Sequence, residues 1–462
     1  MFDLVVIGSG PGGYVAAIRA SQLGMSVAVV EKAELGGVCL NWGCIPTKAL
    51  LKSAQALHYA QDHESYGFDI SGEITPDLEK IVARSRSVAA GMSKGIEFLF
   101  KKNKIGVING SGKIKGPGRV EVTANDGTVT IIEAKNIIIA TGARANSLPF
   151  APIDGDKIIS YRQALIPKTL PKSLAVIGSG AIGSELAFFY RSLGVEVFLI
   201  EYLDNIVPLE DEEVSAQLSR SMRKMGMKVM VSSQVKSVDI LGDICKLTVQ
   251  TKKGEEVLEV ERVLSAVGVV SNIENIGLEE AGVEVIRGKI VVDKYYSTNV
   301  SGIYAIGDVI NTPALAHVAS AEGICCVETI AGLNPKAIDY SNIPGCTYTS
   351  PEIASVGMTE RAVKEKGIEY VIGKFPFTAS GKASAAGERD GFIKLIVDKH
   401  SDEILGAHMI GANVTEMLGG IVTARNLGVR AKDIVHSIFP HPTMSEAIME
   451  AAAASHGEVI HI

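Results

Sequence analysis

Two stretches of this chain, offset by 170 residues, repeat one pattern. Residues 4–31 and 174–201 align without a gap and share 12 identities in 28 positions. Each copy predicts an apolar strand, a Gly-x-Gly-x-x-Gly turn, a helix and a second apolar strand that ends in glutamate. The residues of the pattern are Gly8, Gly10, Gly13 and Glu31 in the first copy and Gly178, Gly180, Gly183 and Glu201 in the second.

The two copies predict two dinucleotide-binding βαβ units. In such a unit the first glycine permits a tight turn, the second lets a pyrophosphate approach the backbone, and the third lets the helix pack on the strand. The pyrophosphate meets the N–H groups of the helix N-terminus, and the glutamate binds a ribose diol. One copy alone could be an ordinary glycine turn. The second site should prefer NAD to NADP, because Glu201 would repel a 2′-phosphate and residues 202–208 contain no arginine or lysine.

Length and charge narrow the class of protein. A chain of 462 residues suggests about three domains. The net charge of −7, from 45 basic and 52 acidic side chains, favours neither nucleic acid nor anionic membranes as partners. No apolar run approaches the roughly 18 residues that span a bilayer, and an apolar strand begins at Leu4 without a basic leader. We therefore expect a cytoplasmic chain, or an organelle-matrix chain trimmed of a transit peptide.

Outside the repeats, three apolar segments end in turns. Residues 137–142 and 263–268 each predict a strand followed by a turn. Residues 302–308 place Asp308 at the carboxyl end of a strand, where α/β sheets bind ligands. From residue 343 the pattern changes to shorter strands and helices. The sequence thus predicts an α/β protein with two Rossmann-like domains, a central region and a C-terminal α+β interface domain.

Two of the six cysteines, Cys39 and Cys44, follow Glu31 closely. In a regular helix they would lie about 7.5 Å apart along the axis, whereas a disulfide needs Cβ atoms about 3.8 Å apart. The helix must therefore be distorted if they pair, and Gly43 and Pro46 permit that. Two buried thiols or half of a zinc site are the other interpretations, although no histidine lies within ten residues. We favour a redox disulfide beside a nucleotide site.

Six segments together point to one family. They are GSGPGGYVAA, GGVCLNWGCIPTKAL, ATGA, GSGAIGSELA, GIYAIGDV and HPTMSE, and with them the chain resembles the pyridine nucleotide–disulfide oxidoreductases over nearly its whole length. It is most similar to the members that oxidise dihydrolipoamide, the E3 components of 2-oxoacid dehydrogenase complexes. The resemblance implies FAD at the first fingerprint, NAD at the second, a Cys39–Cys44 disulfide and a homodimer. It also implies a lipoyl domain as substrate carrier and docking on the acyltransferase (E2) core, in 2-oxoacid dehydrogenase or glycine cleavage complexes.

The resemblance also assigns residues and domains. Lys48 and Glu185 would pair beside the flavin; Glu185 is expected in the first turn of its helix, where a carboxylate is favourable on dipole grounds alone. The implied FAD contacts are Gly8, Gly10, Gly13, Glu31, Lys48, Gly112, Thr141, Gly142, Asp308 and Ala316, and the implied NAD contacts are Gly178, Gly180, Gly183, Glu201, Val235 and Gly268. The implied domains are 1–145 for FAD, 146–270 for NAD, 271–342 completing the FAD site and 343–462 for dimerisation. No metal is implied.

A base is needed because a dithiol attacks a disulfide only as a thiolate, and a free thiol has a pKa of about 8.5. A neutral histidine can take the proton near pH 7 while a carboxylate orients its other ring nitrogen. His441 and Glu446 fit that dyad, and a surface histidine near a helix start is the simpler alternative. The remaining cysteines, Cys245, Cys325, Cys326 and Cys346, are expected to be buried small apolar side chains.

The expected reaction is oxidation of dihydrolipoamide to lipoamide with NAD⁺ as acceptor. His441 would deprotonate a substrate thiol that attacks Cys39, and Cys44 would pass the electrons to the flavin. Another NAD(P)H-dependent disulfide reductase of the family is the alternative. A glutathione reductase should favour NADP, and a mercuric reductase should carry a C-terminal cysteine pair, whereas the last cysteine here is Cys346. A flavoprotein scaffold without turnover would not need the two cysteines and the dyad.

Overall fold

The computed structural model describes residues 1–462, which divide into two compact units. The first unit contains residues 1–50, 79–146 and 268–338, and the second contains residues 51–78, 147–267 and 339–462. None of the helices combines the length and the apolar character needed to cross a bilayer. The division into four domains made from the sequence stays a prediction.

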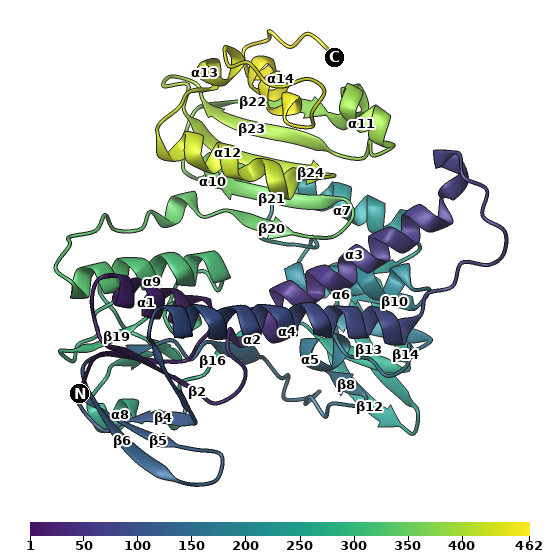
Figure 1. The fold of residues 1–462 in the computed structure, drawn as a ribbon. Helices are drawn as coiled ribbons and strands as arrows, with labels where there is room; N and C mark the ends of the chain where they lie inside the picture. The colour runs from purple at the N-terminus through teal and green to yellow at the C-terminus, as the bar shows by residue number, and fades with distance from the viewer. The chain divides into compact units, whose positions relative to one another are not determined.

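A seven-stranded sheet forms the centre of the first unit (Figure 1). Its parallel strands are β1 (Phe2–Ile7), β2 (Val27–Glu31), β3 (Gly106–Asn109), β6 (Val129–Ile139) and β19 (Ile303–Ala305), in the order β3-β2-β1-β6-β19. The first half of β6 instead pairs antiparallel with β5 (Arg119–Thr123), which pairs with β4 (Ser111–Ile114). Two short pairs, β7 (Ala143–Ala145) with β16 (Val269–Ser271) and β17 (Val285–Ile286) with β18 (Lys289–Ile290), complete the strands.

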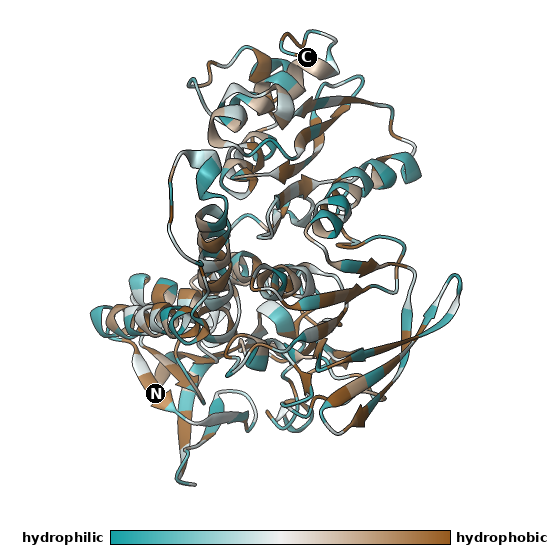
Figure 2. Ribbon diagram, turned by 90° about the vertical axis from the view of Figure 1, so that its right-hand side faces the viewer, coloured by the Kyte–Doolittle hydropathy of each residue, from teal (hydrophilic) through white to brown (hydrophobic).

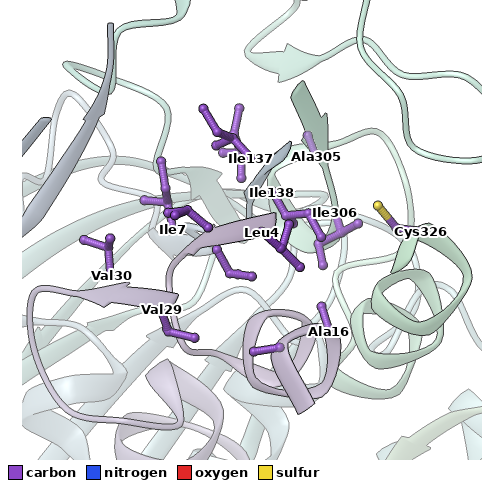
Figure 3. Packing of buried hydrophobic residues seen from close by; sticks show 14 of the residues in the cluster. Leu4, Ile7, Ala16, Val29, Val30, Ile137, Ile138, Ala305, Ile306 and Cys326 are labelled. Atoms are coloured by element: carbon purple, nitrogen blue, oxygen red, sulfur yellow. The ribbon is translucent and has the colours of Figure 1, made fainter. Parts of the chain in front are cut away.

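The core of the first unit lies between this sheet and two helices, α1 (Pro11–Gln22) and α9 (Ala316–Ile330), as Figure 3 shows for residues such as Leu4, Ala16 and Cys326. Strand β2 is buried at every position, as expected for a parallel strand covered on both faces. Helices α1 and α9 approach closely, since a Cβ on Gly323 would lie 2.8 Å from the Gly12 carbonyl oxygen. The other helices are α2 (Gly37–Trp42), α3 (Cys44–Gln61), which continues into the second unit, α4 (Leu78–Lys102) and α8 (Leu278–Ala281).

The second unit begins with a five-stranded parallel sheet in the order β11-β10-β9-β15-β8. Its elements are β8 (Ile158–Ile159), α5 (Tyr161–Ala164), β9 (Ser173–Ile177), α6 (Ala181–Ser192), β10 (Glu196–Ile200), α7 (Glu212–Lys224), β11 (Lys228–Met230) and β15 (Arg262–Ser265). The register repeats that of the first unit: Leu4 faces Val27, and Leu174 faces Val197. The predicted pair of βαβ units is therefore confirmed.

Two antiparallel sheets complete the second unit. Strands β12 (Gln234–Leu241), β13 (Ile244–Thr251) and β14 (Gly254–Val260) form one, and β13 alternates between buried and more exposed positions. Figure 2, coloured by hydropathy, shows hydrophobic segments along many of the strands of the chain. The C-terminal sheet has the order β20-β21-β24-β23-β22. Its strands are β20 (Gly345–Thr347), β21 (Glu352–Gly357), β22 (Tyr370–Pro376), β23 (Phe392–Asp398) and β24 (Ile404–Gly411), with helices α10 (Glu360–Glu365), α11 (Gly381–Ala386), α12 (Val414–Asn426), α13 (Ala431–Val435) and α14 (Glu446–Ser455). This confirms the predicted α+β C-terminal part.

Candidate active site

The three glycines of the first fingerprint are required for three different reasons. Gly8 has φ +103°, and a Cβ on it would lie 2.3 Å from the Ala140 carbonyl oxygen. A Cβ on Gly13 would lie 1.9 Å from the Gly8 oxygen, so this glycine lets α1 pack on the turn. A Cβ on Gly10 would meet nothing within 4 Å, which leaves open space at the N-terminus of α1.

The second fingerprint reproduces this geometry. Gly178 has φ +97°, and a Cβ on it would lie 2.5 Å from the Ala266 carbonyl oxygen. A Cβ on Gly183 would lie 2.0 Å from the Gly178 oxygen, and a Cβ on Gly180 would meet nothing within 4 Å. Neither α1 nor α6 has a side-chain cap or an acid in its first turn. The first N–H groups of each helix are therefore available to an anion. Both loops therefore have the open space and the free N–H groups that binding of a dinucleotide pyrophosphate requires.

Each fingerprint is bonded to its glutamate. Oε2 of Glu31 accepts hydrogen bonds from Ser9 N–H and Ser9 Oγ–H at 2.9 and 2.6 Å, and Oε1 accepts the Ala33 N–H at 2.9 Å. Glu201 has equivalent contacts in the second copy. Both glutamates are buried at the carboxyl end of a strand. Their positions fit a contact with a ribose, which stays a prediction.

The predicted turn after β6 is present and closed by side chains. Thr141 Oγ1–H donates to the Asn272 carbonyl oxygen at 2.6 Å, and Asn272 Nδ2–H donates to the Thr141 oxygen at 3.0 Å. Gly142 has φ +67°. This exchange fastens the end of β6 to the segment that follows β16.

Asp308 lies just beyond β19, in a short 3-10 turn, as predicted. Its carbonyl oxygen accepts hydrogen bonds from Ser271 Oγ–H at 2.6 Å and Lys289 Nζ at 2.7 Å. Burial raises the pKa of the Asp308 carboxyl above its ordinary value, and Lys289 opposes that rise. Ala316 is the first residue of α9, so its N–H has no acceptor within the helix.

Three other predicted contacts can only be made by backbone. A Cβ on Gly112 would lie 3.1 Å from Ile7 Cγ2 and 3.3 Å from Val30 Cγ1, so packing alone explains this glycine. The Val235 side chain is buried in a hydrophobic core of the second unit. Gly268 has φ +93° and open space around its Cα. Their roles in cofactor binding stay predictions.

A break between two helices brings the cysteines together. Helix α2 ends at Trp42, Gly43 adopts φ −142° and ψ −111°, and α3 begins at Cys44. The predicted distortion at Gly43 is therefore confirmed. Cys39 is half-buried and Cys44 is exposed. A hydrogen bond with Cys44, burial and the charge of Cys44 raise the pKa of Cys39 far above its ordinary value, and the positive charge of Lys48 opposes this rise.

The cysteine segment is fastened to the first fingerprint. Gly36 N–H donates to the Ser9 carbonyl oxygen at 3.1 Å and to Ser9 Oγ at 3.2 Å. A Cβ on Gly37 would lie 2.7 Å from the Gly10 Cα. The structure therefore places the cysteines beside the first dinucleotide loop.

The remaining cysteines largely follow expectation. Cys245, Cys325 and Cys326 are buried, as predicted, but Cys346 is only half-buried, so its prediction was wrong. Cys346 lies on the short strand β20, at the edge of the C-terminal sheet, and an edge strand is covered less completely than a central one. No group of three or more histidine, cysteine, aspartate or glutamate side chains could hold a metal ion. The zinc interpretation of Cys39 and Cys44 thus gains no further ligand.

Glu185 does not lie in the first turn of its helix, contrary to the prediction. Helix α6 begins at Ala181, which places Glu185 in the second turn, where the dipole effect is weak. Its side chain is buried, and Oε1 accepts the Tyr348 N–H at 3.0 Å. Lys48 belongs to the other unit, so the pairing of Lys48 with Glu185 stays a prediction.

His441 and Glu446 form the predicted pair. Nδ1 of His441 lies 2.9 Å from Oε1 of Glu446, and Oε2 accepts the Thr443 N–H at 2.8 Å. Burial opposes ionisation of Glu446, but these hydrogen bonds and the charges of His441 and His461 hold its pKa below the ordinary value. The His441 side chain is 78% exposed, which suits a base that meets a substrate.

Sequence reasoning missed the two serines that hold the glutamates. Ser9 and Ser179 occupy the same place in the two copies, between the first and second glycines. That identity was the available signal, because the other variable positions of the two fingerprints differ.

Known proteins of one family are similar to this chain over nearly its whole length. A family model described as pyridine nucleotide-disulphide oxidoreductase matches residues 2–323, and the model of its dimerisation domain matches residues 343–452. The chain is 48% identical to the dihydrolipoyl dehydrogenase of Rhizobium etli and 47% identical to that of Zymomonas mobilis, each over 100% of this chain and 99% of the relative. The crystal structure of LpdA from Mycobacterium tuberculosis is similar with a TM-score of 0.90 and 28% identity, over 97% of this chain and 98% of that one.

Proposed function

The chain belongs to the pyridine nucleotide-disulphide oxidoreductase family, as its motifs predicted, and from that premise we propose that it oxidises dihydrolipoamide with NAD⁺. It would thus be a dihydrolipoyl dehydrogenase. The observation that carries the proposal is the helix break at Gly43, which sets Cys39 against Cys44 beside the first fingerprint. FAD, bound at that fingerprint, supplies a two-electron relay between the dithiol and NAD⁺ at the second fingerprint.

The cysteines exchange a disulfide with the substrate. A substrate thiolate attacks Cys39 Sγ, the Cys39–Cys44 bond breaks, and Cys44 leaves as a thiolate. The second substrate thiolate then attacks the substrate sulfur bound to Cys39, which closes the lipoamide disulfide and releases Cys39.

His441 is the base for this exchange. The Glu446 carboxylate fixes the proton on Nδ1, which leaves Nε2 to take a proton from a substrate thiol. The match to the dimerisation domain supports a homodimer. We propose that Lys48 and Glu185 pair beside the flavin, and that the fingerprint residues and Asp308 bind the two cofactors.

The proposed partners follow from the reaction. Dihydrolipoamide would arrive on a lipoyl domain, and the dimer would dock on an acyltransferase core of a 2-oxoacid dehydrogenase complex. The chain would work where those complexes work, in the cytoplasm or an organelle matrix.

The test is NADH formation by the purified flavin-loaded protein with free dihydrolipoamide. We expect rapid turnover with NAD⁺ and much slower turnover with NADP⁺. Oxidised glutathione with NADPH should give little activity. If glutathione reduction with NADPH outpaces dihydrolipoamide oxidation with NAD⁺, the proposal is wrong and the glutathione reductase alternative holds.

A further inference from the structure

The serine between the first two glycines contacts the glutamate in both copies. In the second copy, Ser179 N–H and Ser179 Oγ–H donate to Oε2 of Glu201 at 2.9 and 2.7 Å. The Leu203 N–H donates to Oε1 at 2.9 Å. The Glu201 carboxylate thus accepts three hydrogen bonds from its own chain, distributed over both oxygens.

Strand pairing produces this contact. Strands β9 and β10 are parallel neighbours, with Ile177 opposite Ile200, so Ser179 and Glu201 follow adjacent strand ends. Ser179 is fully buried, and Glu201 is 7% exposed. A hydrogen bond to a carboxylate that is shielded from water is stronger than a neutral or solvated one.

We propose that Ser179 is a positioning residue that sets the preference for NAD over NADP, by holding the Glu201 carboxylate in one orientation. The inference rests on the proposed function in one respect, that the second fingerprint binds NAD. A carboxylate held in place offers its remaining acceptor capacity to a ribose diol without loss of side-chain entropy. It also cannot turn away from a 2′-phosphate, whose negative charge it repels.

Removing the Ser179 hydroxyl tests how the orientation of the Glu201 carboxylate affects cofactor preference. The hydrogen-bond partner of this hydroxyl is Glu201, whereas the hydroxyl of Ser9 also accepts the Gly36 N–H. Removing the hydroxyl at position 179 therefore tests the carboxylate, while the same change at position 9 would also disturb the cysteine segment.

Ser184 provides a matched control. It is a fully buried serine of the same loop and helix, and its Oγ–H donates to the Ser179 carbonyl oxygen at 2.9 Å. Ser184→Ala therefore removes a buried hydroxyl next to Ser179 without removing a hydrogen bond to Glu201.

The experiment is calorimetric titration of the flavin-loaded protein with ADP-ribose and with 2′-phospho-ADP-ribose, which needs no turnover. For Ser179→Ala we expect the ratio of the two dissociation constants, phosphorylated over unphosphorylated, to fall roughly tenfold, because a hydrogen bond to a charged group is lost. The KM for NAD⁺ should rise while kcat stays within about twofold. Ser184→Ala should leave the ratio within about twofold, and Ser179→Cys, a weaker donor of similar size, should fall in between.

A ratio within about twofold of wild type in folded Ser179→Ala overturns the inference, as does an equal fall in Ser184→Ala. If Ser179→Ala does not fold, the ratio in Ser179→Cys decides the question in the same way. Loss of selective binding in the wild-type protein refutes the NAD site itself. A protein that binds ADP-ribose selectively but does not oxidise dihydrolipoamide refutes the proposed substrate and leaves this inference standing.

Discussion

Nδ1 of His441 lies 2.9 Å from Oε1 of Glu446, although five positions of chain separate the two residues. The second oxygen of the same carboxylate is held by the Thr443 N–H at 2.8 Å. The carboxylate therefore cannot rotate freely, and it fixes both the ring orientation and the tautomer of the histidine.

His441→Gln should lower dihydrolipoamide-dependent turnover by about 10²- to 10⁴-fold, the usual contribution of a general base. Glu446→Gln should lower it less, because the histidine keeps its proton-accepting nitrogen. His456→Gln is the control, since His456 directly follows α14 and pairs with Asp402. Steady-state rates of the three variants decide the matter, and an equal loss in His456→Gln would show that the effect belongs to the helix and not to the dyad.

The air-oxidised protein should contain one disulfide. If Cys39 and Cys44 are joined, four of the six cysteines should react with a thiol reagent in denaturant, and all six after reduction. Cys39→Ser should give five reactive thiols under both conditions. Six reactive thiols in the air-oxidised wild-type protein would rule out the resting disulfide.

Substitutions at two glycines of the second fingerprint should affect NAD⁺ binding and fold stability separately. Gly180→Ala places a methyl group in open space, so the fold should keep its stability while affinity for NAD⁺ falls. Gly183→Ala forces a Cβ to within 2.0 Å of the Gly178 oxygen, and we expect a loss of about 1–3 kcal/mol from the free energy of unfolding. Urea unfolding and NAD⁺ titration of both variants test this, and the reverse order of effects would contradict it.

Glu210 should make stability depend on pH. Burial and Asp211 raise its pKa to about 7, although Ser355 opposes the rise, and Oε2 has no hydrogen-bond partner. The folded state then binds more protons than the unfolded state between the ordinary glutamate pKa and about pH 7. Stability therefore falls as pH rises through that window, by roughly 3 kcal/mol.

Glu210→Gln removes this titration. The variant should match the wild-type protein in urea unfolding at acidic pH and exceed its stability at mildly alkaline pH. Identical pH profiles would show that Glu210 is ionised without penalty.

Replacing a buried, paired lysine should lower the free energy of unfolding more than replacing an exposed one. Lys394, 1% exposed, contacts Asp211 at 3.0 Å and Glu360 at 2.6 Å. Lys394→Met leaves the buried Asp211 carboxylate without a cation, whereas Glu360 keeps its pair with Lys364, and we expect a cost of about 3–5 kcal/mol. Lys399→Met removes an exposed pair with Glu369 and should cost less than about 1 kcal/mol. Chemical denaturation compares the two, and similar losses would contradict this explanation.

The parts that local patterns specify were predictable from sequence. The βαβ units, the turn before Asp308 and the break at Gly43 each depend on a few neighbouring residues, and so does the dyad of His441 and Glu446. Contacts between distant segments were not predictable. The packing of α1 on α9 depends on Gly12 meeting Gly323, and nothing near either glycine indicates its partner.

The error at Glu185 has a similar origin. Helix α6 begins only after Gly180, and a glycine-rich turn does not mark the first helical residue clearly. The prediction therefore placed Glu185 nearly a turn too early. The role of Ser179 was missed because the βαβ pattern predicts that β9 and β10 are neighbours but does not specify which side chains meet beyond their ends.

The seating of Gly37 on Gly10, with Gly36 hydrogen-bonded to Ser9, makes the phosphate loop and the cysteine segment one mechanical piece. The segment from Glu31 to Gly37 therefore fixes where the cysteines lie, because a residue inserted before Gly36 could move the sulfurs only by breaking these contacts. Substrate preference can change through the surfaces around this piece. The distance that electrons travel from the cysteine sulfurs to the first cofactor is far harder to alter. We expect this distance to change less during evolution than the surfaces that select the substrate.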